Sequence, residues 1–307
     1  MRRLAPLLGG VRRGFIRSKR HWRTFLVPPV KLSIITPSFR NSPWLKLCVA
    51  SVADQQGVDA EHIVQDAGSD DGTLDWLTHD PRVQAYVEKD KGMYDAINRG
   101  LRRAGGEILA YLNCDEQYLP RALESVQRTF SECRTADVLY GDALVTAPDG
   151  CLLAFRKAYP PVRAFILTAH LYILTCALFW RREVTEAGNR FDSGMRDLGD
   201  MEFVLRLLAD GYRFVHHPDY LATFAVTGEN RSLGVNARAE MADMRRRAPA
   251  WMRALKLPLN AVRLASKLAH GCYVQHGPIE YALHVGNGER GRRHFLVPRV
   301  SFRWPAS

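Results

Sequence analysis

The chain has 307 residues, of which 47% are hydrophobic and 24% are charged, so a disordered or fibrous protein is excluded. The formal net charge of +11 is unevenly distributed, because residues 1–31 carry +9, residues 231–307 carry +10 and the residues between them carry −8. An acidic centre argues against a protein that binds nucleic acid with the surface of its fold. Basic ends on an acidic body instead indicate a catalytic domain that is tethered to an anionic partner.

The cysteines and the apolar segments favour a cytoplasmic protein. Six cysteines occur without a C-x-x-C pair or a histidine spacing that suits zinc, so we expect free thiols in a reducing compartment. The basic N-terminus has only a short apolar patch and no small-residue cleavage site, and we expect no signal peptide there. The longest apolar run, residues 164–180, is interrupted by Thr168, His170 and Thr175, so we expect a core segment and no transmembrane helix.

From Lys31 onward, short β-rich runs alternate with helical ones, which predicts an α/β fold with a mostly parallel sheet flanked by helices. The predicted strands span residues 32–35, 62–65, 83–87, 108–112, 137–142, 151–155, 177–180 and 212–215, and the predicted helices span 44–52, 93–103 and 201–209. We place the end of the first strand before Thr36-Pro37-Ser38, because proline lacks the N–H group that extends a strand ladder. Beyond residue 230 an arginine-rich helical pattern follows, and residues 279–285 and 295–304 are compatible with a hairpin.

Acidic residues follow two of the predicted strands and open one predicted helix. Asp66 closes the second strand, Asp115 and Glu116 close the fourth, and Asp200 stands at the start of the helix. Parallel α/β sheets bind ligands at the carboxyl ends of their strands, where a carboxylate can hold a divalent cation or act as a general base. Taken singly, each residue also has a simpler explanation as a turn former, a solvated strand end or a helix-start acid.

Four segments occur here in the order that a known enzyme family shows. They are residues 33–39 (SIITPSF), 66–73 (DAGSDDGT), 90–100 (DKGMYDAINRG) and 106–116 (GEILAYLNCDE). With these segments the chain resembles the inverting nucleotide-sugar glycosyltransferases of family 2, whose fold is the Rossmann-like GT-A type. The third segment is similar to that of a subgroup found in bacterial surface-polysaccharide synthesis, and the resemblance extends from Lys31 to Asn230.

The resemblance implies roles for individual residues on the donor side. The nucleotide base pocket would be lined by Thr36, Pro37 and Ser38, with Asp66 accepting a hydrogen bond from the base. The ribose or diphosphate would lie beside Lys91, Asp95 and Asn98. The implied donor is a nucleotide sugar of the UDP, GDP or dTDP type.

The resemblance also implies a metal and a catalytic base. Asp115 matches the carboxylate that contacts a divalent cation, Mg²⁺ or Mn²⁺, and Asp200 matches the catalytic aspartate. Asn113 and Cys114 stand where many relatives carry aspartate, and Glu116 stands where aspartate is usual. We therefore expect the metal to depend on Asp115 together with diphosphate and water.

The basic ends predict contact with a membrane surface. We divide the chain into a basic amphipathic N-terminal segment, residues 1–30, a GT-A domain, residues 31–230, and a basic C-terminal extension, residues 231–307. The first segment has apolar residues at near-heptad spacing between arginines, as in a helix that lies on an anionic leaflet, and a solvated tail is the alternative. The C-terminal extension lies on the anionic leaflet in the same way, is a solvated tail, or contacts the acceptor's pyrophosphate. Because enzymes of the resembled kind often act on lipid-linked acceptors, we expect a peripheral location on the inner face of the cytoplasmic membrane.

The sequence thus predicts an inverting, metal-dependent glycosyltransferase that acts on a lipid-linked or saccharide acceptor in polysaccharide biosynthesis. A sugar-phosphate nucleotidyltransferase is an alternative, but it should carry a Gly-rich basic loop after the first strand, which Thr36-Pro37-Ser38-Phe39 is not. A degenerate, non-catalytic nucleotide-binding protein is a second alternative. A scaffold or a nucleic-acid binder is the rival from another class, and we expect no nucleic acid among the partners.

Overall fold

The computed structural model describes residues 30–228, 234–286 and 291–304. The strands are β1 (Leu32–Ser38), β2 (Ala60–Asp66), β3 (Gln84–Val87), β4 (Ile108–Tyr111), β5 (Glu116–Tyr118), β6 (Val138–Thr146), β7 (Leu152–Arg156), β8 (Leu178–Arg181), β9 (Phe214–Ala225), β10 (Ile279–His284) and β11 (Arg292–Val297). The helices are α1 (Ser42–Ala53), α2 (Thr73–Leu77), α3 (Met93–Arg103), α4 (Ala122–Glu132), α5 (Arg163–Thr168), the short 3₁₀ helix η1 (Thr175–Ala177), α6 (Arg182–Glu186), α7 (Gly199–Ala209), α8 (Val235–Arg247), α9 (Ala250–Ala254) and α10 (Lys256–Ala269).

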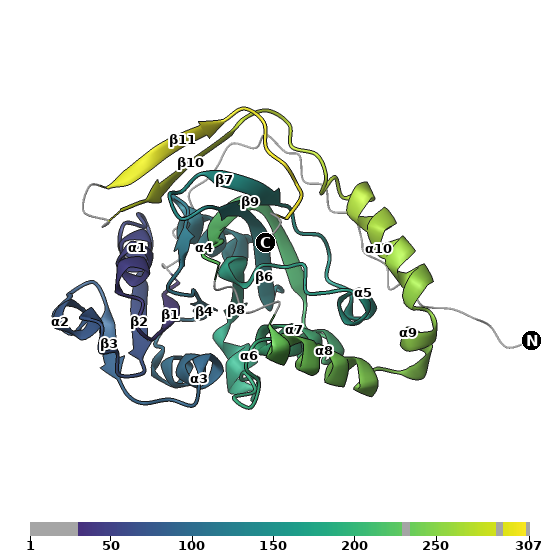
Figure 1. Ribbon diagram of the computed structural model, residues 1–307, viewed down its shortest axis with the longest axis horizontal. Coiled ribbons are helices and arrows are strands. Elements are labelled where there is room, and N and C mark those ends of the chain that lie inside the picture. Colours follow the sequence, from purple (N-terminus) through teal and green to yellow (C-terminus); the bar gives the residue numbers. More distant parts are fainter. Residues whose placement is uncertain (1–29, 229–233, 287–290, 305–307) are drawn as a thin grey trace, which may run out of the picture.

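One mixed sheet forms the centre of the molecule, with strand order β3-β2-β1-β4-β8-β6-β9-β5 and β7 paired to β6 (Figure 1). Strands β3, β2, β1 and β4 are mutually parallel, as expected where a helix connects each strand to the next. Strand β8 then enters antiparallel between β4 and β6. The α/β fold that the sequence predicts is confirmed, and the strands predicted near 137–155 and 177–180 belong to the antiparallel part.

Strand β1 is longer than the sequence predicts, because it continues through Pro37 to Ser38. Backbone bonds alternate along it: Ile35 accepts a bond from Leu112 on the β4 side, whereas Ser38 accepts one from Ala67 on the β2 side. By this alternation the nitrogen of Pro37 faces the β4 side, beyond the last residue that β4 pairs with β1. No ladder bond is lost there, so proline does not end the strand.

Apolar side chains pack on both faces of the sheet. One cluster joins α3 and α7 to the sheet through stacked rings, with the centroids of Phe191 and Phe203 4.4 Å apart and that of Trp180 5.3 Å from Phe203. The opposite cluster joins the sheet to α1 and α4 through residues such as Cys48 and Phe130. Burial on both faces explains why β4 is apolar along its whole length.

The C-terminal part packs onto this sheet rather than forming a separate core among the described residues. Ala248 and Met252, which flank and lie in α9, belong to the same apolar cluster as α3 and α7. Strands β10 and β11 form an antiparallel hairpin, so the predicted hairpin is confirmed, with its second strand at 292–297 instead of 295–304. Arg292 fixes the hairpin to α1 by bonding Asp54 at 2.6 Å, and His284 bonds the same carboxylate at 2.8 Å.

The predicted N-terminal segment lies outside the described residues up to residue 29, and its helix stays a prediction. The boundary predicted at residue 230 also stays a prediction. In the part of the chain that the structure describes, no helix has both the length and the apolar character that crossing a bilayer requires.

Gly106 gives a test of this packing. A Cβ at this position would stand 2.7 Å from backbone atoms of Lys31, Leu32 and Ser33, which cannot move without displacing β1. Gly106→Ala should therefore lower the free energy of unfolding by about 1–3 kcal/mol in urea denaturation. Gly105→Ala is the matched control, because its Cβ would meet only the ends of the Glu61 and Lys31 side chains, at 3.3 and 3.4 Å. Equal losses in the two variants would contradict this explanation.

Candidate active site

Asp66, the last residue of β2, organises the turn that follows. Its Oδ1 accepts the backbone N–H groups of Gly68 and Ser69 at 2.9 and 2.7 Å, and its Oδ2 accepts the hydroxyls of Ser38 and Ser69, both at 2.8 Å. The four acceptor positions of the carboxylate are thus in use. A further donor can bond Asp66 only where one of the two serine hydroxyls rotates away.

The other residues expected around the nucleotide base lie in two different places. Ser38 lies beside Asp66, whereas the Thr36 hydroxyl lies inside the fold, 2.8 Å from Nε2 of His62 and 3.6 Å from Sγ of Cys48. Pro37, between them, is buried on the opposite face of β1. The structure therefore brings Ser38 and Asp66 together and leaves Thr36 in contact with α1.

The segment that leads into α3 also divides its expected site residues. Lys91 is exposed, and its backbone N–H donates to Asp95 at 3.1 Å. Asp95 forms an ion pair with Arg99 at 3.0 Å. Asn98 is buried, and its amide bonds both backbone groups of Phe191, donating at 2.7 Å and accepting at 3.0 Å. Asn98 thus holds a loop, while Lys91 and Asp95 remain near the surface.

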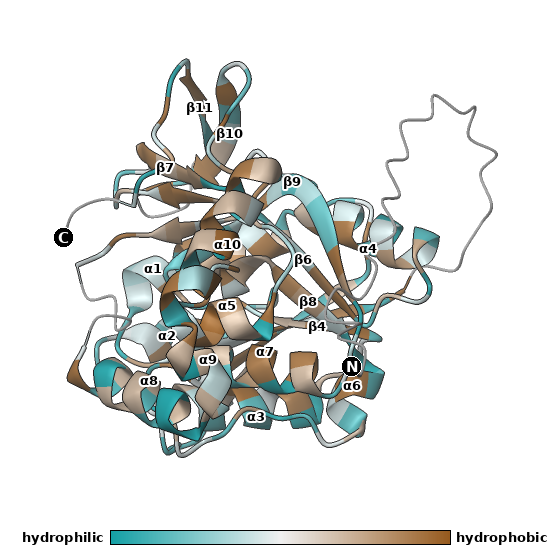
Figure 2. Cartoon of the chain, turned by 90° about the vertical axis from the view of Figure 1, so that its right-hand side faces the viewer, coloured by the Kyte–Doolittle hydropathy of each residue, from teal (hydrophilic) through white to brown (hydrophobic). Residues whose placement is uncertain are grey.

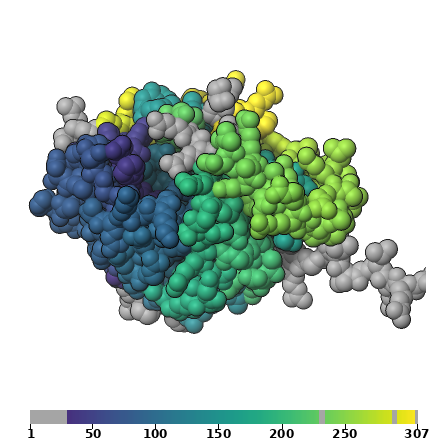
Figure 3. All heavy atoms as spheres, turned by 60° about the horizontal axis from the view of Figure 1, so that its bottom comes forward, coloured from purple at the N-terminus to yellow at the C-terminus, as the bar shows by residue number. Residues whose placement is uncertain are grey.

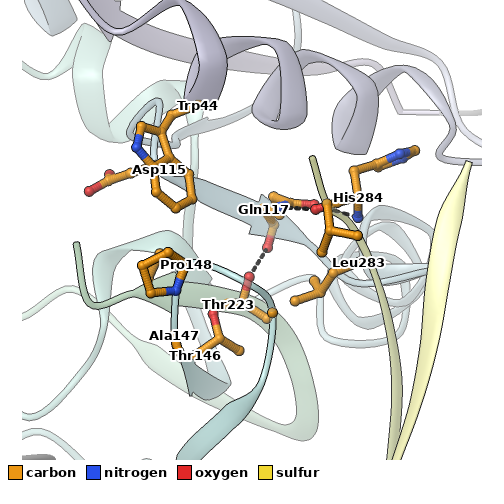
Figure 4. A pocket seen from close by; sticks show the side chains of 12 residues that line it. Trp44, Asp115, Gln117, Thr146, Ala147, Pro148, Thr223, Leu283 and His284 are labelled. Atoms are coloured by element: carbon orange, nitrogen blue, oxygen red, sulfur yellow. Dashed lines mark hydrogen bonds between the residues drawn. The ribbon is translucent and has the colours of Figure 1, made fainter. Parts of the chain in front are cut away.

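Asp115 lies between β4 and β5, next to Trp44 of α1 (Figure 4). In Figure 4 its carboxylate points away from Gln117 and His284, which line the hollow beneath the C-terminal hairpin. That hollow encloses about 10 Å³, which is room for one water molecule and far too small for a nucleotide. Asp115 and Trp44 also line this hollow, which therefore gives Asp115 no room for a nucleotide on the side of the hairpin.

Glu116 is a buried acid whose environment the sequence did not reveal. Burial, followed by the negative charge of Asp115 and more weakly that of Asp200, raises the pKa of Glu116 to about 8, against a hydrogen bond of 2.8 Å from the N–H of Asn113. This coupling shows that acids from the β4–β5 connection and from α7 lie within electrostatic reach of one another. No signal in the sequence distinguishes Glu116 from a solvated strand end.

Asp200 is the second residue of α7 and is partly buried. Its Oδ1 accepts the N–H of Met201 at 2.7 Å and the hydroxyl of Tyr94 at 3.4 Å. Burial raises the pKa of Asp200 to about 6, although both hydrogen bonds lower it. The carboxylate is consequently ionised near neutral pH and remains basic enough to accept a proton.

The ring of Tyr94 packs directly against Gly199 at the start of α7. A Cβ at Gly199 would stand 2.6 Å from the ring of Tyr94, so only glycine lets the ring reach the start of α7. The ring is buried and stacks on Phe191 with centroids 5.7 Å apart. Tyr94 stands within the DKGMYDAINRG segment, but no pattern in the sequence distinguishes it from a tyrosine of the core.

Glu240 of α8 holds the backbone that leads into α7. Its two carboxylate oxygens accept the N–H groups of Arg196, Asp197 and Leu198 at 2.6, 3.1 and 2.8 Å. No local pattern in the sequence indicates this contact, because 42 residues separate Glu240 from Leu198.

Two of the predicted acids, Asp115 and Asp200, lie within electrostatic reach of the buried Glu116. Figure 3 shows a recess between the blue residues of the N-terminal half and the green residues of α7 and α8. Among the described residues no group of three or more His, Cys, Asp or Glu side chains is placed to hold a metal ion. A partly exposed carboxylate still suits Mg²⁺, which binds through one or two carboxylates and completes its shell with phosphate oxygens and water. Asp115 is thus a possible metal ligand, and Asp200 is a carboxylate that can accept a proton.

Comparison with known proteins gives a consistent assignment. Residues 33–143 match the family described as glycosyl transferase family 2. A protein of Mycobacterium tuberculosis named PGL/p-HBAD biosynthesis glycosyltransferase is 30% identical over 187 residues, which cover 58% of this chain and 70% of the relative. The chondroitin synthase of Pasteurella multocida is 25% identical over 210 residues, or 66% of this chain, which spans only 21% of that larger protein.

Solved structures share the fold. TarS 1-349 of Staphylococcus aureus in complex with UDP has a TM-score of 0.57 and 16% identity, and the match covers 86% of this chain and 98% of that one. The mannosyltransferase PcManGT of Pyrobaculum calidifontis, in complex with GDP-Man and Mn²⁺, has a TM-score of 0.54 and 18% identity, with 82% and 79% covered. These likenesses confirm the GT-A type fold that the sequence predicts. Together with the family match and the mycobacterial relative, they show that this chain is a glycosyltransferase and belongs to glycosyl transferase family 2.

Proposed function

We propose that this glycosyltransferase inverts the anomeric centre of a nucleotide sugar, with Asp200 as the general base. The observation that carries the proposal is the partly buried Asp200 carboxylate, with its pKa of about 6, within electrostatic reach of Glu116 at the start of β5. An acceptor hydroxyl gives its proton to Asp200 while its oxygen forms a bond to the anomeric carbon. The bond from that carbon to the diphosphate oxygen breaks, and its electron pair leaves with the nucleoside diphosphate.

The proposed donor is a UDP, GDP or dTDP sugar. TarS in complex with UDP and with UDP-GlcNAc, and PcManGT in complex with GDP-Man, support a nucleotide-sugar donor for this chain. We assign the nucleotide base to the turn that Asp66 organises with Ser38. Thr36 and Pro37 support this turn from within β1. A nucleotide base that donates a hydrogen bond to Asp66 would replace the hydrogen bond from one of the two serine hydroxyls. Lys91 and Asp95 would approach the ribose or diphosphate, and Asn98 would act by holding the Phe191 loop.

Asp115 is the proposed protein ligand for Mg²⁺ or Mn²⁺. A cation held there offsets the charge that appears on a departing diphosphate. The Mn²⁺ in the PcManGT complex supports this cofactor. Within this chain the role of Asp115 is to present one hard oxygen ligand beside the diphosphate, and the arrangement leaves the remaining ligands to phosphate oxygens and water.

The proposed acceptor is a saccharide, soluble or lipid-linked, in polysaccharide biosynthesis at the inner face of the cytoplasmic membrane. Relatives named chondroitin synthase and hyaluronan synthase support transfer to a glycan. The basic composition of residues 1–31 and 231–307 supports an anionic membrane as the partner.

Asp115→Ala tests the metal assignment. Nucleoside diphosphate affinity, measured by calorimetry with Mg²⁺ or Mn²⁺, should fall at least about tenfold, because the cation loses its protein ligand. EDTA should weaken binding to the parent chain and leave the variant unaffected. Asp75→Ala, an exposed acid on α2, should behave like the parent chain. If EDTA leaves the nucleoside diphosphate affinity of the parent chain unchanged, no metal takes part in donor binding.

Asp200→Asn tests the base. Asparagine keeps the shape and the hydrogen bonds of the helix start but takes no proton, so turnover should fall by roughly 10² to 10⁴ while donor affinity changes only a few-fold. Glu202→Gln is the control, because Glu202 pairs with Arg206 at 2.9 Å and is not bonded to Asp200. Normal turnover in Asp200→Asn would show that the general base does not lie in α7.

The pH dependence gives an independent test of Asp200. Because its pKa is raised to about 6, the carboxylate is ionised and active above that pH and becomes protonated below it. Turnover of the parent chain should therefore fall by about tenfold for each pH unit below 6. The residual turnover of Asp200→Asn should lack this decrease. An acid limb that persists in the variant would assign the titration to another group.

A further inference from the structure

Helix α10 turns its apolar side to solvent and its polar side to the protein. The exposed side carries Leu257, Ala261, Leu264 and Leu268, at spacings of four, three and four residues that place them in one stripe. The side toward the protein carries the partly buried Arg263 and Lys267. A helix on the surface of a water-soluble domain has the opposite polarity. Figure 2 looks onto the side of the molecule that carries α9 and α10.

Exposed apolar side chains concentrate in this part of the structure. Among the described residues, six of the thirteen large hydrophobic side chains that are exposed lie between Trp251 and Leu268. Leu257 is 81% exposed and Leu268 is 64% exposed. The six are Trp251, Leu255, Leu257, Val262, Leu264 and Leu268, which we call the α10 face. Single exposed apolar residues are ordinary, but a contiguous group marks an interaction surface.

The surroundings of the α10 face are positive. Residues 244–279 contain seven Lys and Arg and no Asp or Glu. Arg245 is used within the fold, since it bonds the carbonyls of Leu167 and Ala169. Arg253 and Lys256, by contrast, are exposed next to the apolar stripe, and neither forms an ion pair with a carboxylate of the described chain.

Cations also gather beneath the helix. Burial and the charge of Arg156 lower the pKa of Lys267, and Arg263 lowers it further. Across the described residues none of these three forms a salt bridge with an acid. These cations face the protein, so they add to the positive potential around α10 through space rather than by direct contact with an anion.

We propose that the α10 face docks on an anionic lipid bilayer, with Leu257, Leu264 and Leu268 entering the interface between headgroups and acyl chains. A bilayer surface offers both hydrocarbon and negative charge, so it can take up the leucines and attract the Lys and Arg side chains beside them. A second copy of the face and the chain's own residues 1–31 are both strongly basic, so charge repulsion opposes either of them as the occupant. The inference deepens the proposed membrane location, but it does not require that glycosyl transfer occur.

The test measures binding of the full chain to phosphatidylglycerol-containing vesicles and to phosphatidylcholine vesicles, without substrate. The parent chain should sediment with the anionic vesicles and be released by salt, which screens charge over about 10 Å at 0.1 M. The triple variant Leu257→Gln, Leu264→Gln, Leu268→Gln should bind roughly tenfold more weakly or worse. Its thermal unfolding should match that of the parent, because the stripe faces solvent.

Two controls separate this proposal from its alternatives. Val235→Gln with Leu296→Gln removes apolar residues that are 84% and 66% exposed elsewhere, and this pair should bind vesicles as the parent does. Asp200→Asn should also bind normally, so a wrong assignment of the base leaves this test intact. Undiminished binding by the triple variant overturns the proposal. So does a parent dimer that the triple variant dissociates, or vesicle binding that appears only after residues 1–29 are deleted, because each gives the face another occupant.

Discussion

The carboxylate of Glu240 fixes the backbone on which the rest of the site depends. It accepts three consecutive N–H groups, those of residues 196–198, directly before α7 begins. Hydrogen bonds to an ionised acceptor are among the strong ones, and these satisfy donors that would otherwise lack partners before the helix start. The same loop is held at Phe191 by Asn98 of α3. Helices from the two halves of the chain thus determine together where Asp200 stands.

The close approach of α3 to α7 determines how basic Asp200 is. Gly199 admits the ring of Tyr94, which packs against Phe191 and leaves the Asp200 carboxylate with limited access to water. Burial then raises the pKa of Asp200 into the range where a carboxylate exchanges protons near neutral pH. Glycine at residue 199 therefore has a packing reason: a side chain there would displace Tyr94.

The C-terminal elements α8, α10 and the β10–β11 hairpin have different structural roles. Helix α8 supplies Glu240 to the backbone before α7, and the hairpin is held at the end of α1 through Arg292 and Asp54. Helix α10 contributes almost no apolar side chain to the core and presents its leucines outward. A segment that looks uniformly basic in sequence is therefore partly structural, as Arg245 is, and partly available to an anionic partner, as Lys256 is.

The sequence by itself determined the alternation of strands and helices, the acids at the strand ends and the family, because these depend on local periodicity and on contiguous motifs. It placed Asp66 at the end of β2 and Asp200 at the start of α7, where the structure has them. Asp115, predicted to close the fourth strand, lies instead in the connection between β4 and β5, because β4 ends at Tyr111 and Glu116 opens β5. Only the tertiary structure decided that Pro37 continues β1, since that depends on where the neighbouring strand stops. It alone decided that Thr36 and Asn98 bond within the fold, that Glu116 is buried and that Glu240 holds the loop before α7. These contacts join residues far apart in the chain, and burial and electrostatic fields exist only once distant segments have packed together.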